Sequence, residues 1–92
     1  METTDKKNNA VRSRMIDQQW ADAVAATGIV LDQVMKTNRC ARLDHCVATL
    51  KILAAGHLFG SEAHRKLGQV QGILIEHGAM TFENADEINE SI

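Results

Sequence analysis

The sequence contains no proline and no tyrosine, and its only aromatic residues are Trp20, Phe59 and Phe82. The lack of proline removes the commonest helix breaker. The scarcity of aromatic residues disfavours a strand-rich domain, because strands are enriched in aromatic and β-branched residues. No apolar run approaches the length of about 20 residues that a membrane-spanning helix needs, and residues 1–7 lack the apolar core of a secretory signal peptide. We therefore expect a helix-rich, soluble protein of the cytoplasm, without membrane association.

Cysteine is scarce as well, with only Cys40 and Cys46. On one helix these residues would lie about 9 Å apart along the axis, which is too far for an intrachain disulfide. Free thiols are typical of a reducing cytosol. Cys46 lies on an apolar stripe and is predicted to belong to the core. Cys40, between Arg39 and Arg42 near a helix start, is the more reactive thiol of the two.

The potential metal ligands do not have the spacing of a metal site. A closed zinc site needs paired ligands such as CxxC or HxxxH, and the sequence has neither pattern. The histidines are His45, His57, His64 and His77. A helical domain of 92 residues rarely has room for a substrate pocket. We expect no metal, no cofactor and no enzymatic activity.

Apolar residues recur every three to four positions over most of the chain, which is the period of amphipathic helices. The predicted helices cover residues 11–36, 40–59 and 62–77. Segments of these lengths with short connections are typical of antiparallel neighbours. We therefore expect an all-α fold, either an antiparallel helical hairpin or a three-helix bundle, over residues 11–78.

The ends of the chain and the helix boundaries carry further signals. Residues 1–10 are polar and are predicted to form a disordered lead, whereas residues 79–92 form either an acidic tail or a short helix. Asn84 and Glu87 have the spacing of a capping box for that short helix. Gly60 is expected to end the second helix and Ser61 to cap the third.

The apolar stripe of each helix predicts which side chains form the core. The residues expected to be largely buried are Trp20, Leu31, Val47, Leu50, Leu67 and Leu74.

Two glycines, Gly68 and Gly72, occupy one face of the third predicted helix, and Ile75 extends that face. Glycine destabilises a helix interior, so a pair of them suggests the close approach of another backbone. The small residues around Ala55 would be a suitable partner within the monomer. A subunit interface is the equal alternative, because small domains often complete their cores by association. We expect a homodimer whose interface includes the second or third helix.

The net charge of −2 is unevenly distributed. Two basic clusters stand out, one at the first turn and one at the start of the third helix. Their residues are Lys36, Arg39, Arg42, Arg65 and Lys66. They are candidate contacts for a protein partner or for nucleic acid, with the third helix as a recognition helix. The negative total charge makes this electrostatic footprint weak for a DNA-binding protein.

The C-terminal segment is acidic, and its candidate partner contacts are Glu83, Asp86, Glu87 and Glu90. A protein of this profile is expected to be a protein-interaction module. By analogy of class rather than from particular residues, we expect a small regulator or inhibitor of the phage-encoded inhibitor or adaptor type. It would act by occupying a surface of a larger protein. The alternative is a small DNA-binding regulator that uses the first turn and the third helix.

Overall fold

The computed structural model describes the backbone of residues 2–90 and 92 and the side chains of residues 18–90 and 92. The regular structure in this part of the chain is helical. The helices are α1 (Glu2–Met35), α2 (Ala41–Ala54), α3 (Gly60–Glu76) and α4 (Phe82–Asn89). Within that described part there is no strand. The all-α prediction is confirmed.

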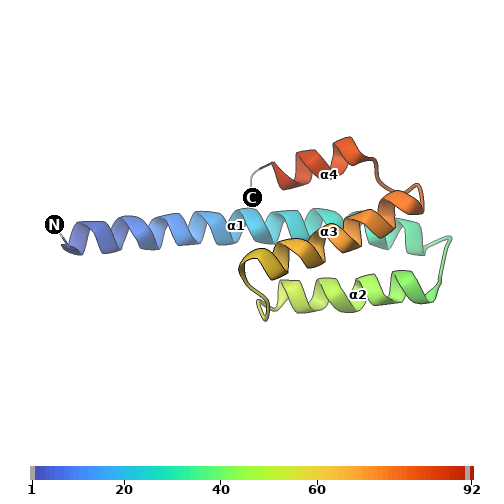
Figure 1. The fold of residues 1–92 in the computed structure, drawn as a ribbon, viewed down its shortest axis with the longest axis horizontal. Helices are drawn as coiled ribbons and strands as arrows, with labels where there is room; N and C mark the ends of the chain where they lie inside the picture. The colour runs from blue at the N-terminus through green and yellow to red at the C-terminus, as the bar shows by residue number, and fades with distance from the viewer. Residues whose placement is uncertain (1, 91) are drawn as a thin grey trace.

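The helices alternate in direction along the chain. Figure 1 shows α1 as the longest element, with α2 along one side, α4 along the other, and α3 crossing it. α2 packs against both α1 and α3, and α4 packs against α1. The end of α3 therefore lies beside the start of α2, where the Arg42 guanidinium meets the Glu76 carboxylate.

The core lies where α1, α2 and α3 face one another. Its largest fully buried side chains are Leu31, Leu43, Leu53, Leu67, Leu74, Val70, Thr27 and Cys46. Of the six residues predicted to be buried, the four leucines are buried. Trp20 and Val47 are partly buried and pack against this core, and each borders an open hollow.

α2 ends earlier than predicted, at Ala54 instead of residue 59. Gly56 adopts a left-handed conformation with φ of 75°. The Gly56 N–H donates to the Leu53 carbonyl at 3.2 Å, and the His57 N–H donates to the Ile52 carbonyl at 3.4 Å. This pair of bonds is the Schellman motif that ends many helices at a glycine. Gly56 is the first glycine along α2 that can adopt this conformation, so the helix ends there.

α3 begins at Gly60, and Phe59 occupies the N-cap position without a side-chain hydrogen bond. Gly60 therefore does not end α2, and the prediction that Ser61 caps α3 was wrong. The C-terminal end of α3 agrees with the sequence. Gly78 has φ of 70°, and the Ala79 N–H donates to the Leu74 carbonyl at 2.9 Å in a second Schellman motif.

A short C-terminal helix is present, but a different pair of residues caps it. The Asn84 N–H donates to Thr81 Oγ1 at 3.1 Å, and the Thr81 N–H donates to Asn84 Oδ1 at 3.3 Å. The capping box is therefore Thr81–Asn84 and not Asn84–Glu87. An asparagine side chain can replace the usual Glu at the third position because its oxygen also accepts the N-cap N–H.

The first helix begins at Glu2, whereas the sequence predicted a start at residue 11. The side chains of residues 1–17 lie outside the described part of the chain. The disordered lead expected over residues 1–10 stays a prediction.

Candidate functional site

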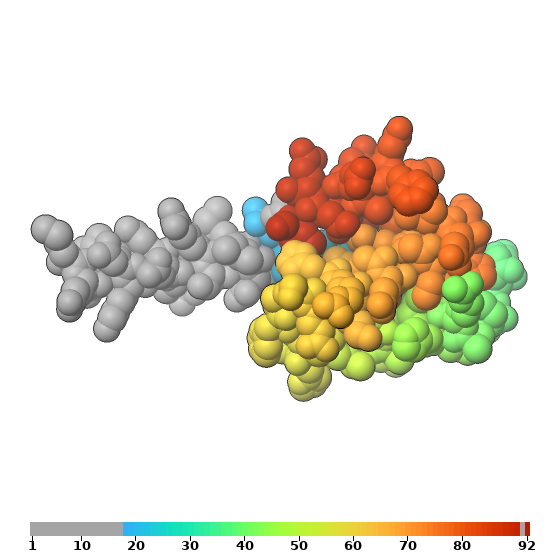
Figure 2. All heavy atoms as spheres, viewed as in Figure 1, coloured from blue at the N-terminus to red at the C-terminus, as the bar shows by residue number. Residues whose placement is uncertain are grey.

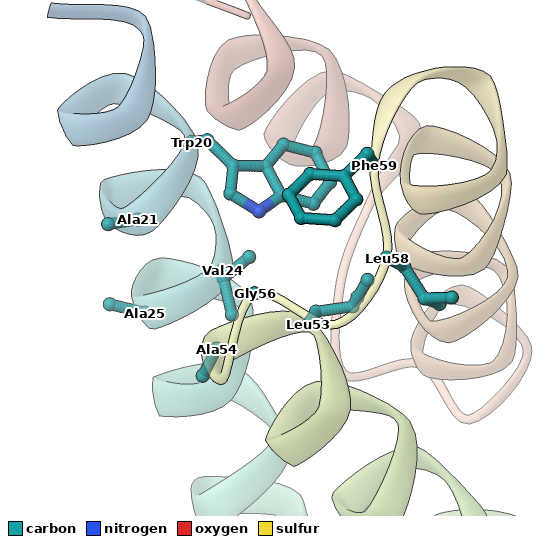
Figure 3. Close-up of a pocket in the computed structure, with 9 residues that line it drawn as sticks. All are labelled: Trp20, Ala21, Val24, Ala25, Leu53, Ala54, Gly56, Leu58 and Phe59. Carbon is teal, nitrogen blue, oxygen red and sulfur yellow. The ribbon is translucent and has the colours of Figure 1, made fainter. Parts of the chain in front are cut away.

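An open hollow lies between α1 and the connection that joins α2 to α3. Its volume is about 410 Å³. Figure 3 shows Trp20 reaching from α1 and Phe59 coming from the connection. Its surface is mostly apolar, and the residues that line it are Trp20, Ala21, Val24, Ala25, Leu53, Ala54, Gly56, Leu58 and Phe59. We call it the aromatic hollow.

The early end of α2 creates this hollow. Because α2 stops at Ala54, the following residues cross from α2 to α3 in an irregular segment instead of a further helical turn. Phe59 has extended backbone angles of −133° and 160° at the N-cap position of α3. Its side chain is 80% exposed although it borders an apolar surface. An exposed aromatic side chain beside an apolar hollow is typical of interaction surfaces.

Trp20 also borders a second hollow of about 240 Å³, which Phe59 and His64 line as well. The Trp20 and His64 rings are 5.0 Å apart between centroids and are tilted by 55°. This contact holds the indole between α1 and α3. Trp20 is therefore a half-buried, positioned aromatic residue, accessible from two hollows.

A groove between α1 and α2 continues from the aromatic hollow and shares Val24, Ala25 and Ala54 with it. Its volume is about 290 Å³. Gly28 lies in its floor, and a Cβ placed there would lie 3.9 Å from Leu50 Cδ1. The charged residues beside it are Asp32 and Lys51.

The first basic cluster lies at the turn between α1 and α2, as predicted. Lys36 and Arg39 are exposed and line a hollow of about 360 Å³ with Asp32 and Met35. Arg42 forms an ion pair with Glu76, in which Arg42 Nη1 lies 2.9 Å from Glu76 Oε2. Both side chains are largely exposed. An exposed pair of this kind contributes about 0–1 kcal/mol to stability, but it neutralises the arginine.

The second basic cluster, Arg65 and Lys66, lies in the first half of α3. Arg65 is exposed and Lys66 is half-buried. This part of α3 follows the α2–α3 connection, whereas the Arg42–Glu76 pair marks the opposite end of α3 (Figure 1). The five basic candidate residues therefore form two groups at opposite ends of the helical fold of one chain.

The predicted self-association face is open in the chain. A Cβ at Gly68 or Gly72 would meet no atom within 4 Å. Close packing of α2 on α3 therefore does not explain these glycines. Ile75 is half-buried, and Ala55 is exposed at the C-cap of α2. The structure does not bring Ala55 against Gly72, which lines a hollow with Thr49 instead.

The acidic segment is helical. Glu83, Asp86 and Glu87 are exposed on α4, and Glu90 is its C-cap. Phe82 is 74% exposed. The other side of α4 packs on the core through Ala85 and Ile88.

The thiols differ in their surroundings as the sequence suggests. Cys40 is exposed, and its Sγ lies 4.0 Å from His77 Nε2. Cys46 is buried, and this burial raises the pKa of its thiol above the ordinary value of 9.0. Two smaller effects act in opposite directions: the neighbouring Cys40 raises the pKa further, and Arg42 lowers it.

In the described part of the chain, no three His, Cys, Asp or Glu side chains lie close enough together to hold a metal ion. None of the described helices is long and apolar enough to span a membrane.

Sequence reasoning missed two features. The first is a buried polar network that joins α1, α3 and α4 through Thr27, Gln71 and Asn89. The second is the aromatic hollow, because the second helix was expected to continue to residue 59. The one signal was Gly56, which precedes Phe59 by three residues and can end a helix as well as Gly60 can.

No protein-family model matches the chain, and no curated protein or solved structure shows significant similarity to it.

Proposed function

We propose that the chain is a non-enzymatic protein-interaction module of the cytoplasm, a regulator or inhibitor that occupies a surface of a larger protein. In this proposal α1, α2 and α3 form an antiparallel bundle that presents the aromatic hollow to the partner. The module acts as a homodimer. The observation that carries the proposal is the aromatic hollow, with Phe59 80% exposed beside an apolar cavity of about 410 Å³.

The chemistry of the hollow supports an apolar anchor as its ligand. Trp20, Leu53 and Phe59 offer carbon surface with few polar atoms, so burial of an apolar side chain there releases water from both partners. Hot spots of protein interfaces are enriched in such aromatic residues in pockets. A segment with one large apolar side chain, such as leucine or phenylalanine, fits the hollow best. An amphipathic helix is the simplest carrier of such a side chain.

The arrangement of the charges weighs against the DNA-binding alternative. Glu76 neutralises Arg42. Of the other candidate contacts, Lys36 and Arg39 lie at one end of the bundle and Arg65 and Lys66 near the other, so these four described residues do not form one continuous stripe that could follow a phosphate backbone. Binding to duplex DNA is therefore the competing outcome of the test below.

The test uses Trp20, the only tryptophan of the chain, as a reporter. Peptides selected from a random amphipathic helix library for binding to the full chain should shift the emission of Trp20 when they bind. Phe59→Ala should weaken these peptides about tenfold or more, as loss of a hot-spot aromatic residue does.

Phe82→Ala is the matched control, because Phe82 is 74% exposed but lies on α4, away from the hollow. It should leave peptide affinity unchanged. If Phe59→Ala and Phe82→Ala have equal effects, the hollow is not the contact surface. If instead the chain binds random duplex DNA with a steep dependence on salt and selects no peptide, the DNA-binding alternative replaces the proposal.

A further inference from the structure

One face of the described part of α1 is exposed. On the side drawn in Figure 2, α3 and α4 cover most of this part of α1, and α2 packs on it as well. Ile29 nevertheless is 60% exposed. Asp22, Ala25 and Lys36 are exposed as well. A large aliphatic side chain in water at the middle of a helix is unexplained by the fold of one chain.

Two charged residues on this face, Asp22 and Lys36, are spaced symmetrically about Ile29. Asp22 precedes Ile29 by seven residues (29 − 22) and Lys36 follows it by seven (36 − 29). Seven residues are about two helical turns, or about 10 Å along the axis, so the three side chains lie along one stripe. In an antiparallel pair of such helices with a two-fold axis at Ile29, Asp22 of each copy lies opposite Lys36 of the other. The face is therefore complementary to itself.

The charged ends of this stripe are available for such pairing. Among the described residues the one ion pair is Arg42–Glu76. Asp22 accepts a hydrogen bond from the Gln18 amide at 2.9 Å, which orients its carboxylate on the helix surface without neutralising it. Lys36 has no carboxylate within ion-pair distance in that part of the chain.

The groove between α1 and α2 runs along the edge of this stripe, with Ala25 and Gly28 among its lining residues and a volume of about 290 Å³. Ala25 lies one helical turn before Ile29 and is exposed, so a second helix on the stripe would also cover the rim of the groove.

We infer that a second copy of this chain docks antiparallel on α1, with the two-fold axis at Ile29. The two Ile29 side chains meet at this axis, and Asp22 of each copy pairs with the partner's Lys36. This inference rests on the self-association in the proposed function and adds the surface and register. It places the interface on α1, whereas the sequence pointed to the glycines of α3.

Disulfide trapping tests the register. In a Cys40→Ser background, which removes the exposed native thiol, Ile29→Cys should form a covalent dimer under mild oxidation. Ile52→Cys is the matched control, because Ile52 is also an exposed isoleucine (44%) but lies on α2 and belongs to neither the stripe nor the groove. It should stay monomeric on a denaturing gel. A mixture of Asp22→Cys and Lys36→Cys chains should cross-link, whereas each of these variants alone should not.

Charge exchange gives an independent measurement. Asp22→Lys brings two lysines together at each end of the interface and should raise the dimer dissociation constant about tenfold. Lys36→Asp should have a similar effect. The double exchange restores opposite charges and should return the constant to near that of the wild type.

The outcomes separate the two proposals. If the wild type sediments as a monomer at tens of micromolar, self-association fails and this inference fails with it, while peptide binding at the aromatic hollow stays a separate result. If the wild type is a dimer but Ile29→Cys does not cross-link faster than Ile52→Cys, only the α1 interface is overturned. If the double charge exchange does not restore the dimer, the antiparallel register is overturned.

Discussion

The side-chain amides of Gln71 and Asn89 exchange two hydrogen bonds. Gln71 Nε2 donates to Asn89 Oδ1 at 2.9 Å, and Asn89 Nδ2 donates to Gln71 Oε1 at 2.8 Å. Gln71 Nε2 also lies 3.3 Å from Thr27 Oγ1, and that hydroxyl donates to the Ala23 carbonyl at 2.8 Å. Because Thr27 is on α1, Gln71 on α3 and Asn89 on α4, this network fixes the C-terminal helix against the core.

Gln71→Ala should lower the free energy of unfolding by about 1–3 kcal/mol, because it leaves the amide of Asn89 without its partner near the core. Gln71→Leu and Asn89→Leu together should cost less than the sum of the two single changes, since the pair is removed as a unit. Urea denaturation of the four proteins of this double-mutant cycle measures the coupling. Gln69→Ala, at an exposed position of the same helix, should change stability by less than about 0.5 kcal/mol. Additive single changes would show that the two amides do not act together.

The sequence predicted the helices and the leucine core but not this network. The period of 3.6 residues identifies which side of a helix is buried, and so placed Leu31, Leu67 and Leu74 correctly. It does not show which polar residues on that side find a partner. Gln71 lies between Gly68 and Gly72, and the sequence was interpreted through these glycines and not through Gln71. Its partner Asn89 lies in a segment that was predicted to be either a tail or a short helix.

The helix ends and the candidate site show the same limit. Gly56 and Gly60 can each end a helix, and the choice between them depends on where α3 must begin to pack on α2. The aromatic hollow follows from that choice. Its residues could not be grouped from the sequence, because Trp20 and Phe59 are distant along the chain and meet only through the tertiary fold.

Gly68→Ala and Gly72→Ala should each raise the free energy of unfolding by about 0.5–1 kcal/mol. Both glycines lie inside α3, and a Cβ at either position meets no atom within 4 Å, so only the helix propensity changes. Gly78→Ala is the contrasting variant, because Gly78 has φ of 70° and an L residue there costs about 1–2 kcal/mol. Denaturant unfolding measures all three. A weaker dimer in Gly68→Ala or Gly72→Ala, detected by sedimentation, would favour the α3 interface expected from the sequence.

Thr81→Ala should destabilise α4 by about 1 kcal/mol, because the Asn84 N–H loses the side-chain acceptor of the capping box. Amide hydrogen exchange in residues 82–89 should become faster, while exchange in α2 stays unchanged. Thr37→Ala is the control, since the Thr37 hydroxyl only donates to the Val34 carbonyl at 3.3 Å at the end of α1. Equal exchange rates in Thr81→Ala and the wild type would show that packing alone holds α4.

Because the Cys46 thiol is buried, we predict that the free energy of unfolding falls at alkaline pH. Burial raises the pKa of its thiol above 9.0 in the folded chain, so the folded state keeps the proton at a pH where the unfolded state has lost it. Below the unfolded pKa both states are protonated, and the contribution to stability is fully present. As pH rises through the unfolded pKa and toward the folded one, the unfolded state binds fewer protons and the free energy of unfolding decreases.

The absence of tyrosine makes this prediction measurable, because no phenol titrates in the same range. Urea unfolding of a Cys40→Ser chain should show a downward slope in stability between about pH 7.5 and about pH 9.8, an interval that begins below the ordinary thiol pKa and ends below the ordinary lysine pKa of about 10.4. Cys46→Ala should be less stable at neutral pH, because it leaves a cavity in the core, but its stability should vary less with pH over this interval. The comparison depends on the slope and not on the absolute stability, so the packing defect does not obscure it. Parallel slopes for the two proteins would mean that the Cys46 thiol ionises equally well in the folded chain, and that its burial does not keep the charged form out of the core.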